Sequence, residues 1–139
     1  MKSRIHIKML AGDYPCQAFL YEDSTACRLC QFHYPTHPPP TEDMIHLLTR
    51  CRATSETRAR VIPDMLNALS QYFPSSLILN NPTHTILTQF LLDPTSLNLP
   101  LSARVSPNHP ALPTILTSCR NICFSIHKDR IRQLGQLKQ

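Results

Sequence analysis

Four residues in the first half of the chain have the types and the spacing of a metal site. Cys27 and Cys30 form a Cys-x-x-Cys pair, and His46 and Cys51 follow with four residues between them. A Cys-x-x-Cys pair can direct two thiolates from one turn to a single ion, and histidine and cysteine at the second spacing complete such sets in small zinc folds. Zinc prefers four such ligands at the corners of a tetrahedron. The sequence therefore predicts one zinc ion held by these four side chains.

A zinc ion with four protein ligands would be structural, because no coordination position remains for water. Its binding would also contribute free energy of folding, since the segment from 27 to 51 has little core of its own. Within a helix, His46 shares a face with Arg50, which leaves Cys51 one residue too far along. We therefore expect the chain to bend after Arg50 so that the sulfur of Cys51 reaches the ion.

Other interpretations of this segment remain open. His33 and His37 lie between the two pairs, beside the proline-rich spacer PTHPPPT (35–41), and either could replace His46 as a ligand. The six cysteines of the chain could instead form disulfide bonds or remain unrelated thiols. The N-terminal residues contain no apolar run of the length of a secretion signal, and no segment approaches the roughly 20 apolar residues that span a membrane. We therefore expect an intracellular protein, in the nucleus or the cytoplasm, with reduced cysteines.

The periodicity of apolar residues predicts the elements that must position this site. Spacings of three and four indicate amphipathic helices, which we expect over residues 2–11, 43–50, 61–73, 86–92 and 112–134. Thr54 or Ser55 looks like a helix cap ahead of the third set of apolar residues. Pro63 would lie in the first turn of that helix or kink it, and Asn81-Pro82 would start the fourth. No alternating strand pattern is present. The predicted fold is mainly α, a small helical domain of about four to five helices with a zinc knuckle near the N-terminus and proline-rich connectors.

The expected organisation of the chain follows from these elements. Residues 1–60 would contain a lead-in helix, ended at Gly12, and the zinc knuckle, while residues 61–139 would form a helical region packed on it as one compact unit. Cys119 and Cys123 fit the apolar face of the last helix, so we expect them in the core. The basic residues between 127 and 132 are expected near the C-terminal end of that helix, where the helix dipole favours cations.

Composition limits the classes of function. The 139 residues are 42% apolar and 17% charged, and 14 Lys and Arg against 9 Asp and Glu give a formal charge of +5. One domain of this size cannot hold a polymerase or a kinase, and the mild basic excess suits an acidic partner such as nucleic acid. The sequence has no nucleophile elbow, no glycine-rich phosphate loop and no paired-carboxylate motif. We therefore expect that the protein is not an enzyme.

The order of the ligands and their neighbours resembles a known family. Cys-x-x-Cys, then Thr41-Glu42-Asp43, then His-x-x-x-x-Cys is similar to the zinc-binding CCHC segment that follows the reverse transcriptase in non-LTR (LINE-like) retrotransposon polyproteins. Three further stretches of the chain resemble the regions that flank this segment in the family: IKMLAGDYPCQ (7–17), FLLDP (90–94) and ICFSIHKDR (122–130). The chain departs from the family in its longer, proline-rich spacer and in lacking the polymerase, since the stretch YEDS (21–24) has no pair of aspartates.

The resemblance implies a zinc-binding remnant of the region C-terminal to a reverse transcriptase, without catalysis of its own. Such a module would hold RNA or DNA, with a reverse transcriptase domain of a longer polyprotein as a further partner. Arginine forks suit phosphate oxygens, and the candidates near the knuckle are Arg28, Arg50, Arg52, Arg58 and Arg60. The nearby acids Glu42, Asp43 and Glu56 are equally compatible with a solvated face of mixed charge.

Two aromatic residues and one apolar helix leave alternatives open. Phe32 and Tyr34 could stack on unpaired bases, although we favour their covering the metal site. The helix ILTQFLL (86–92) is very apolar and could face a partner protein. The alternative function is therefore a protein-interaction module that uses zinc only to hold its fold and binds no nucleic acid.

Overall fold

The computed structural model describes residues 1–11, 14 and 26–137, and within them the chain is mainly helical without a β-strand. The mainly α fold predicted from the sequence is confirmed. Three short turns, η1 (His46–Arg50), η2 (Arg52–Thr54) and η3 (Leu77–Leu79), connect the longer elements. The α-helices are α1 (Lys2–Leu10), α3 (Arg28–His33), α4 (Ser55–Tyr72), α5 (His84–Leu92) and α6 (Leu112–Leu137).

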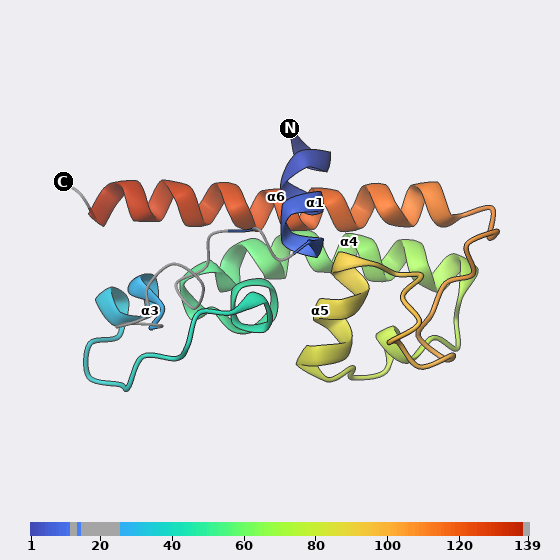
Figure 1. Ribbon diagram of the computed structural model, residues 1–139. Coiled ribbons are helices and arrows are strands. Elements are labelled where there is room, and N and C mark those ends of the chain that lie inside the picture. The colour runs from blue at the N-terminus through green and yellow to red at the C-terminus, as the bar shows by residue number, and fades with distance from the viewer. Residues whose placement is uncertain (12–13, 15–25, 138–139) are drawn as a thin grey trace.

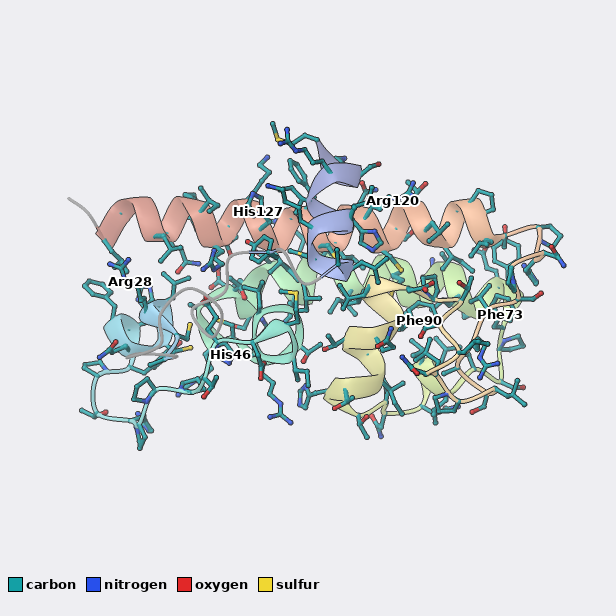
Figure 2. All side chains as sticks on the ribbon, in the orientation of Figure 1. Arg28, His46, Phe73, Phe90, Arg120 and His127 are labelled. Carbon is teal, nitrogen blue, oxygen red and sulfur yellow. The ribbon has the colours of Figure 1, made fainter. Side chains whose placement is uncertain are left out.

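Helices α4 and α6 form the frame of the molecule. They lie side by side and run in opposite directions, while α1 crosses α6 and α5 lies below them in the view of Figure 1. The knuckle elements α3, η1 and η2 all contact α6. They gather at the end of the frame where α4 begins and α6 finishes. Arg28 and His46 lie toward this end of the molecule, and Phe73 lies toward the other (Figure 2).

The long helix α6 supplies the main apolar face of the core. Its inward positions recur at spacings of three and four, as the sequence predicted for this helix. The thiols of Cys119 and Cys123 are buried in that face and donate to the carbonyl oxygens of Phe90 and Leu91 at 3.7 and 3.8 Å, so their expected place in the core is confirmed. Burial raises the pKa of both thiols, which therefore stay protonated at neutral pH.

Helix α5, whose apolar residues could have faced a partner, is part of this core. Phe90 and Leu91 are fully buried, and the remaining apolar residues of the helix pack against the core. The helix also begins later than expected: Thr83 is the N-cap, and its hydroxyl accepts from the backbone N–H of Ile86 at 3.2 Å. Asn81 precedes it with a φ of 51°, in the left-handed region that asparagine tolerates better than most residues.

Helix α4 begins at Ser55 with Thr54 as its N-cap, as the expected cap at Thr54 or Ser55 indicated. Pro63 therefore lies inside the helix and not in its first turn. The expected division of the chain at residue 60 therefore falls within one continuous helix. The expected end of the lead-in helix at Gly12 lies outside the described residues. Within the described residues, no helix combines the length and the apolar character needed to cross a membrane.

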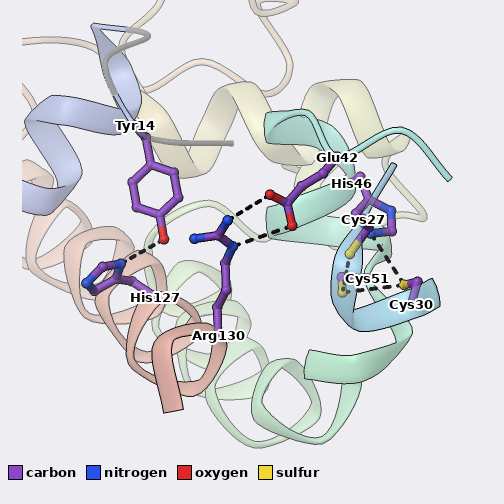
Figure 3. A network of polar contacts seen from close by, with 8 residues as sticks. All are labelled: Tyr14, Cys27, Cys30, Glu42, His46, Cys51, His127 and Arg130. Carbon is purple, nitrogen blue, oxygen red and sulfur yellow. Dashed lines mark hydrogen bonds and ion pairs between the residues drawn. The ribbon is translucent and has the colours of Figure 1, made fainter. Parts of the chain in front are cut away.

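A buried ion pair joins the knuckle to α6. The guanidinium of Arg130 donates to the carboxylate of Glu42 at 2.8 and 3.4 Å, and both side chains are at most 4% exposed. Burial alone would lower the pKa of Arg130, but the hydrogen bonds and charge of Glu42 outweigh it and raise that pKa. Figure 3 shows Arg130 between Glu42 and the Tyr14–His127 hydrogen bond. Helix α6 continues to Leu137, so the basic residues between 127 and 132 lie inside the helix and not in its last turn. The expectation that they complement its C-terminal dipole is wrong.

The variant Glu42→Gln tests the contribution of this pair to stability. We expect the free energy of unfolding to fall by about 3–5 kcal/mol, because the charge of Arg130 would stay buried without the opposite charge of Glu42. Urea denaturation in saturating metal would measure the loss. The control Arg132→Gln removes an arginine that pairs with Asp129 but is 61% exposed, and it should cost less than about 1 kcal/mol. Equal losses in the two variants would contradict the assigned role of Glu42.

Candidate metal centre

The structure brings together the four side chains that the sequence singled out. The donor atoms of Cys27, Cys30, His46 and Cys51 all lie within 4.8 Å of one another, and all four residues are buried. The sulfur of Cys30 lies 3.7 Å from that of Cys51 and 3.6 Å from Nε2 of His46, and the sulfurs of Cys27 and Cys51 are 4.0 Å apart (Figure 3). All three cysteines are free thiols. The arrangement suits a metal ion and contains no disulfide.

The two alternative histidines lie outside this cluster. His33 is exposed, and its Nε2 makes a 3.2 Å hydrogen bond with the side-chain oxygen of Gln133 on α6. His37 is exposed in the proline-rich spacer, and its Nδ1 contacts the hydroxyl of Thr36 at 3.3 Å. His46 is therefore the histidine that joins the three sulfurs.

The Cys-x-x-Cys pair is positioned by a short helix and by the returning end of the spacer. Cys27 is the N-cap of α3, so Cys27 and Cys30 lie one turn apart at the start of that helix. The backbone N–H of Cys27 donates to the carbonyl of Pro40 at 2.8 Å, and an isolated bridge pairs Ala26 with Thr41. These contacts fasten both ends of the proline-rich loop beside the sulfurs. The sequence analysis did not identify α3 as a helix, because its six residues are too few for a periodic pattern.

A π-helical turn allows His46 and Cys51 to face the same point although they are five positions apart. In an α-helix, a residue five positions after His46 would point about 140° away from it. In η1, the backbone N–H of Cys51 donates to the carbonyl of His46 at 2.7 Å, so the turn contains one residue more than an α-helical turn. The wider turn, followed by the extended backbone of Cys51, brings the sulfur to the imidazole. The carboxylate of Asp43 accepts from the backbone N–H of His46 at 2.8 Å and fixes the entry to this turn.

The electrostatics of the cluster show how closely the thiols interact. The hydrogen bond with Cys51 and then burial raise the pKa of Cys27, and burial raises the pKa of Cys30. The pKa of Cys51 is lowered to about 3 because Cys27 donates to its sulfur, and His46 adds to the effect. Three buried sulfurs that share protons in this way are poised to exchange those protons for a cation.

Backbone amides also act on the sulfurs. The amides of Cys30, Arg52 and Ala53 each lower the pKa of one ligand, those of Cys27, Cys30 and Cys51 respectively, although larger effects set the net direction for each thiol. Such N–H···S contacts stabilise thiolates and hold metal ligands in place. The small apolar cluster around the sulfurs contains Leu29, with Leu134 and Leu137 of α6 packed against it.

The five arginines proposed for nucleic acid lie in different surroundings. Arg28, Arg50 and Arg60 are exposed. The guanidinium of Arg52 is exposed too but lies 3.8 Å from the centre of the Tyr34 ring, a cation–π contact. Arg58 is partly buried, and its guanidinium donates to the hydroxyl of Thr54 at 2.8 Å. Burial lowers the pKa of Arg58, and the charges of Cys51 and Cys30 oppose that shift, which indicates that Arg58 lies near the sulfurs.

The aromatic residues do not behave as the sequence analysis favoured. Phe32 is 62% exposed, so it does not cover the metal site. Tyr34 is partly buried and engaged with Arg52. The buried Glu42–Arg130 pair was also missed, although Glu42 stands in the Thr-Glu-Asp motif that carried the family resemblance. Pairing across 88 positions leaves no periodic signal that sequence reasoning could follow.

Comparisons of the chain with protein-family models, with curated proteins and with solved structures find no match. The function proposed below therefore rests on the geometry of the site and on the motifs in the chain itself.

The variants His46→Ala and Cys51→Ala test the ligand set. We expect about one metal ion per wild-type chain and loss of most of the bound metal in either variant, because each removes one of four donors. Inductively coupled plasma mass spectrometry on the purified proteins would measure the content. The matched controls His33→Ala and His37→Ala remove histidines outside the cluster and should keep the ion. Full metal content in the His46 or Cys51 variants would show that the cluster is not the site.

Removal of the metal should affect one end of the molecule more than the other. We expect a strong chelator to abolish hydrogen-exchange protection around residues 27–41, because a small apolar cluster holds this part of the chain, while Leu47 and Leu48, α4 and the core face of α6 keep theirs in the main core. Lowering the pH should release the ion as well, since protons compete with it for thiolates and imidazole, so metal affinity should rise with pH. Protection that is uniform along the chain after chelation would contradict a local role for the ion.

Proposed function

We propose that the cluster binds zinc and that the ion has a structural role. Zinc bonds to sulfur at about 2.3 Å and to imidazole nitrogen at about 2.0–2.1 Å, so a tetrahedral ion separates two sulfurs by about 3.8 Å and a sulfur from a nitrogen by about 3.6 Å. Three of the six donor–donor separations are 4.0, 3.7 and 3.6 Å, and all six are within 4.8 Å, which supports this assignment. Three sulfurs and one nitrogen are a common structural zinc set. This match of donor distances is the single observation that carries the proposal.

The proposed role is binding and not catalysis. A zinc ion with four protein ligands has no position for a water molecule or a substrate, so it cannot activate either one. What the ion does in this arrangement is to tie α3 to η1 and thereby fix the surface on which Tyr34, Arg50 and Arg52 lie. The metal centre then acts through the side chains that it positions.

The likeness to the region after a reverse transcriptase is supported by the places of its motif residues. Thr41 forms the bridge with Ala26, Glu42 pairs with Arg130, and Asp43 caps the turn that begins at His46. Arg130 belongs to the stretch 122–130, which carried a second part of the resemblance. Two separate parts of the resemblance thus meet in one buried contact. We therefore include descent from a non-LTR retrotransposon in the proposal.

Binding of RNA or DNA is the activity proposed for this module. A groove of about 460 Å³ runs between the knuckle, α4 and the end of α6, and Arg52, Arg60 and Arg132 line it. Two acids share this groove, but the carboxylate of Asp129 accepts hydrogen bonds from Thr57, Arg132 and Gln133. These bonds outweigh burial and lower the pKa of Asp129. Because Arg132 is paired with that carboxylate, Arg52 and Arg60 are the arginines of the groove proposed to contact phosphates.

Nucleic-acid binding is tested by fluorescence anisotropy on zinc-loaded protein with labelled single-stranded RNA and DNA. We expect binding that weakens steeply as salt rises, because phosphate contacts release counterions. Arg60→Gln should weaken binding to every sequence and reduce the slope of log K against log salt by about 0.7. The control Arg4→Gln removes an exposed arginine of α1 that does not line the groove and should change little. Undetectable binding at low salt by fully zinc-loaded protein would refute this activity.

A further inference from the structure

A second, smaller pocket lies directly beside the metal cluster. It has a volume of about 170 Å³, and its walls include the ring of Tyr34, the prolines at 38–40 and the ligand His46. Most of its surface is apolar, and two exposed arginines, Arg50 and Arg52, complete the lining. Typical pockets for drug-sized ligands have volumes of about 300–1,000 Å³. This pocket therefore has room for one ring system and not for a larger molecule.

The pocket is held in shape by its own construction. Three consecutive prolines form one wall, and prolines have little conformational freedom to lose. The end of this wall is fastened by the 2.8 Å hydrogen bond from Cys27 to Pro40. Tyr34, just after α3, and the ligands Cys30 and His46 also line the pocket, and a bound metal ion would tie α3 to η1 there. A preformed apolar pocket binds a ligand with little ordering cost on the protein.

The charge of the pocket distinguishes it from the larger groove. No acidic residue is among the residues that line it, whereas Glu56 and Asp129 line the groove. The guanidinium of Arg52 is already stacked on Tyr34 at 3.8 Å, so an arginine and an aromatic ring lie together at the pocket. Arg52 and Tyr34 also line the groove and thus connect the two hollows. The lining combines a planar apolar slot with cations for a neighbouring anion.

We propose that this pocket binds one unpaired nucleobase of single-stranded RNA or DNA, while Arg50 and Arg52 bind the phosphates next to it. Bases in a duplex are stacked and paired, so only an unpaired base can enter such a slot. Aromatic rings and arginine planes are the surfaces on which unpaired bases stack in proteins. The inference rests on the proposed nucleic-acid binding and adds the site and the strandedness to it.

The first test separates the base from the backbone. Zinc-loaded protein is titrated with an oligonucleotide of about 12 uridines, with its deoxy counterpart and with a strand of equal charge in which every base is absent. We expect the abasic strand to bind about tenfold or more weakly, because it lacks the stacking group. Comparison of the ribose and deoxyribose strands shows whether the 2′-hydroxyl contributes. Equal affinity for the abasic strand would overturn the base pocket.

Variants of the lining residues test whether the preference for strands with bases arises in this pocket. Tyr34→Leu should remove that preference, and Tyr34→Trp should keep it. Arg50→Gln should lower the salt slope by about 0.7, whereas Arg4→Gln, which removes an exposed arginine of α1 that does not line the pocket, should leave it unchanged. Zinc content is measured for each variant, so that a loss of fold is not read as a loss of contact. Full retention of the base preference in Tyr34→Leu would overturn the proposal.

The Tyr34→Trp variant also reports binding directly, because the chain contains no tryptophan. We expect its fluorescence to be quenched by the uridine strand and not by the abasic strand or by polyglutamate. Quenching by polyglutamate equal to that by uridine would show that the pocket takes acidic peptides, against the proposal. Strong binding of all strands with no difference among them would remove the pocket but leave nucleic-acid binding intact. Absence of any binding at low salt would remove both.

Discussion

The meeting of four donor atoms at one buried point is the constraint on which this end of the molecule depends. Cys27 and Cys30 come from the start of α3, and His46 and Cys51 come from the two ends of η1. Few apolar contacts hold these elements to each other, and three thiols in one apolar site stay charged only beside a cation. A cation bound at this point would offset the electrostatic cost of the charged thiols through four metal–ligand bonds. Those bonds would also hold the surrounding turns in place.

A second interaction, the buried Glu42–Arg130 ion pair, connects the knuckle to the helical frame. The Glu42–Arg130 pair costs desolvation on both sides and gives its stability only when the two groups are together. A pair of this kind penalises every arrangement in which the knuckle is displaced from α6, because either group would then be buried alone. Since Glu42 lies four positions before His46, the pair fixes the angle at which the ligand turn meets the frame.

The sequence was most informative where chemistry restricts residue type. Only a few side chains bind a soft metal, so Cys27, Cys30, His46 and Cys51 could be identified from identity and spacing. The apolar period of α6 was equally plain, because 26 residues repeat it many times. The π-turn of η1 could not be predicted, since its extra residue follows from the position of the ligands in space and not from local propensity. The neighbours of α5 could not be identified for a related reason. Its apolar residues indicate that the helix is buried, but they do not show whether the core of the same chain or a partner covers it.

The end of the proline-rich spacer (35–41) is held beside the ligands, so its length need not disturb them. The backbone N–H of Cys27 donates to the carbonyl of Pro40, and Ala26 pairs with Thr41, which returns the chain to the start of α3 after the spacer. The entropy of closing such a loop grows only slowly with its length, and prolines reduce what there is to lose. The spacer therefore forms part of the surface beside the cluster without separating Cys30 from His46, whose donor atoms lie 3.6 Å apart.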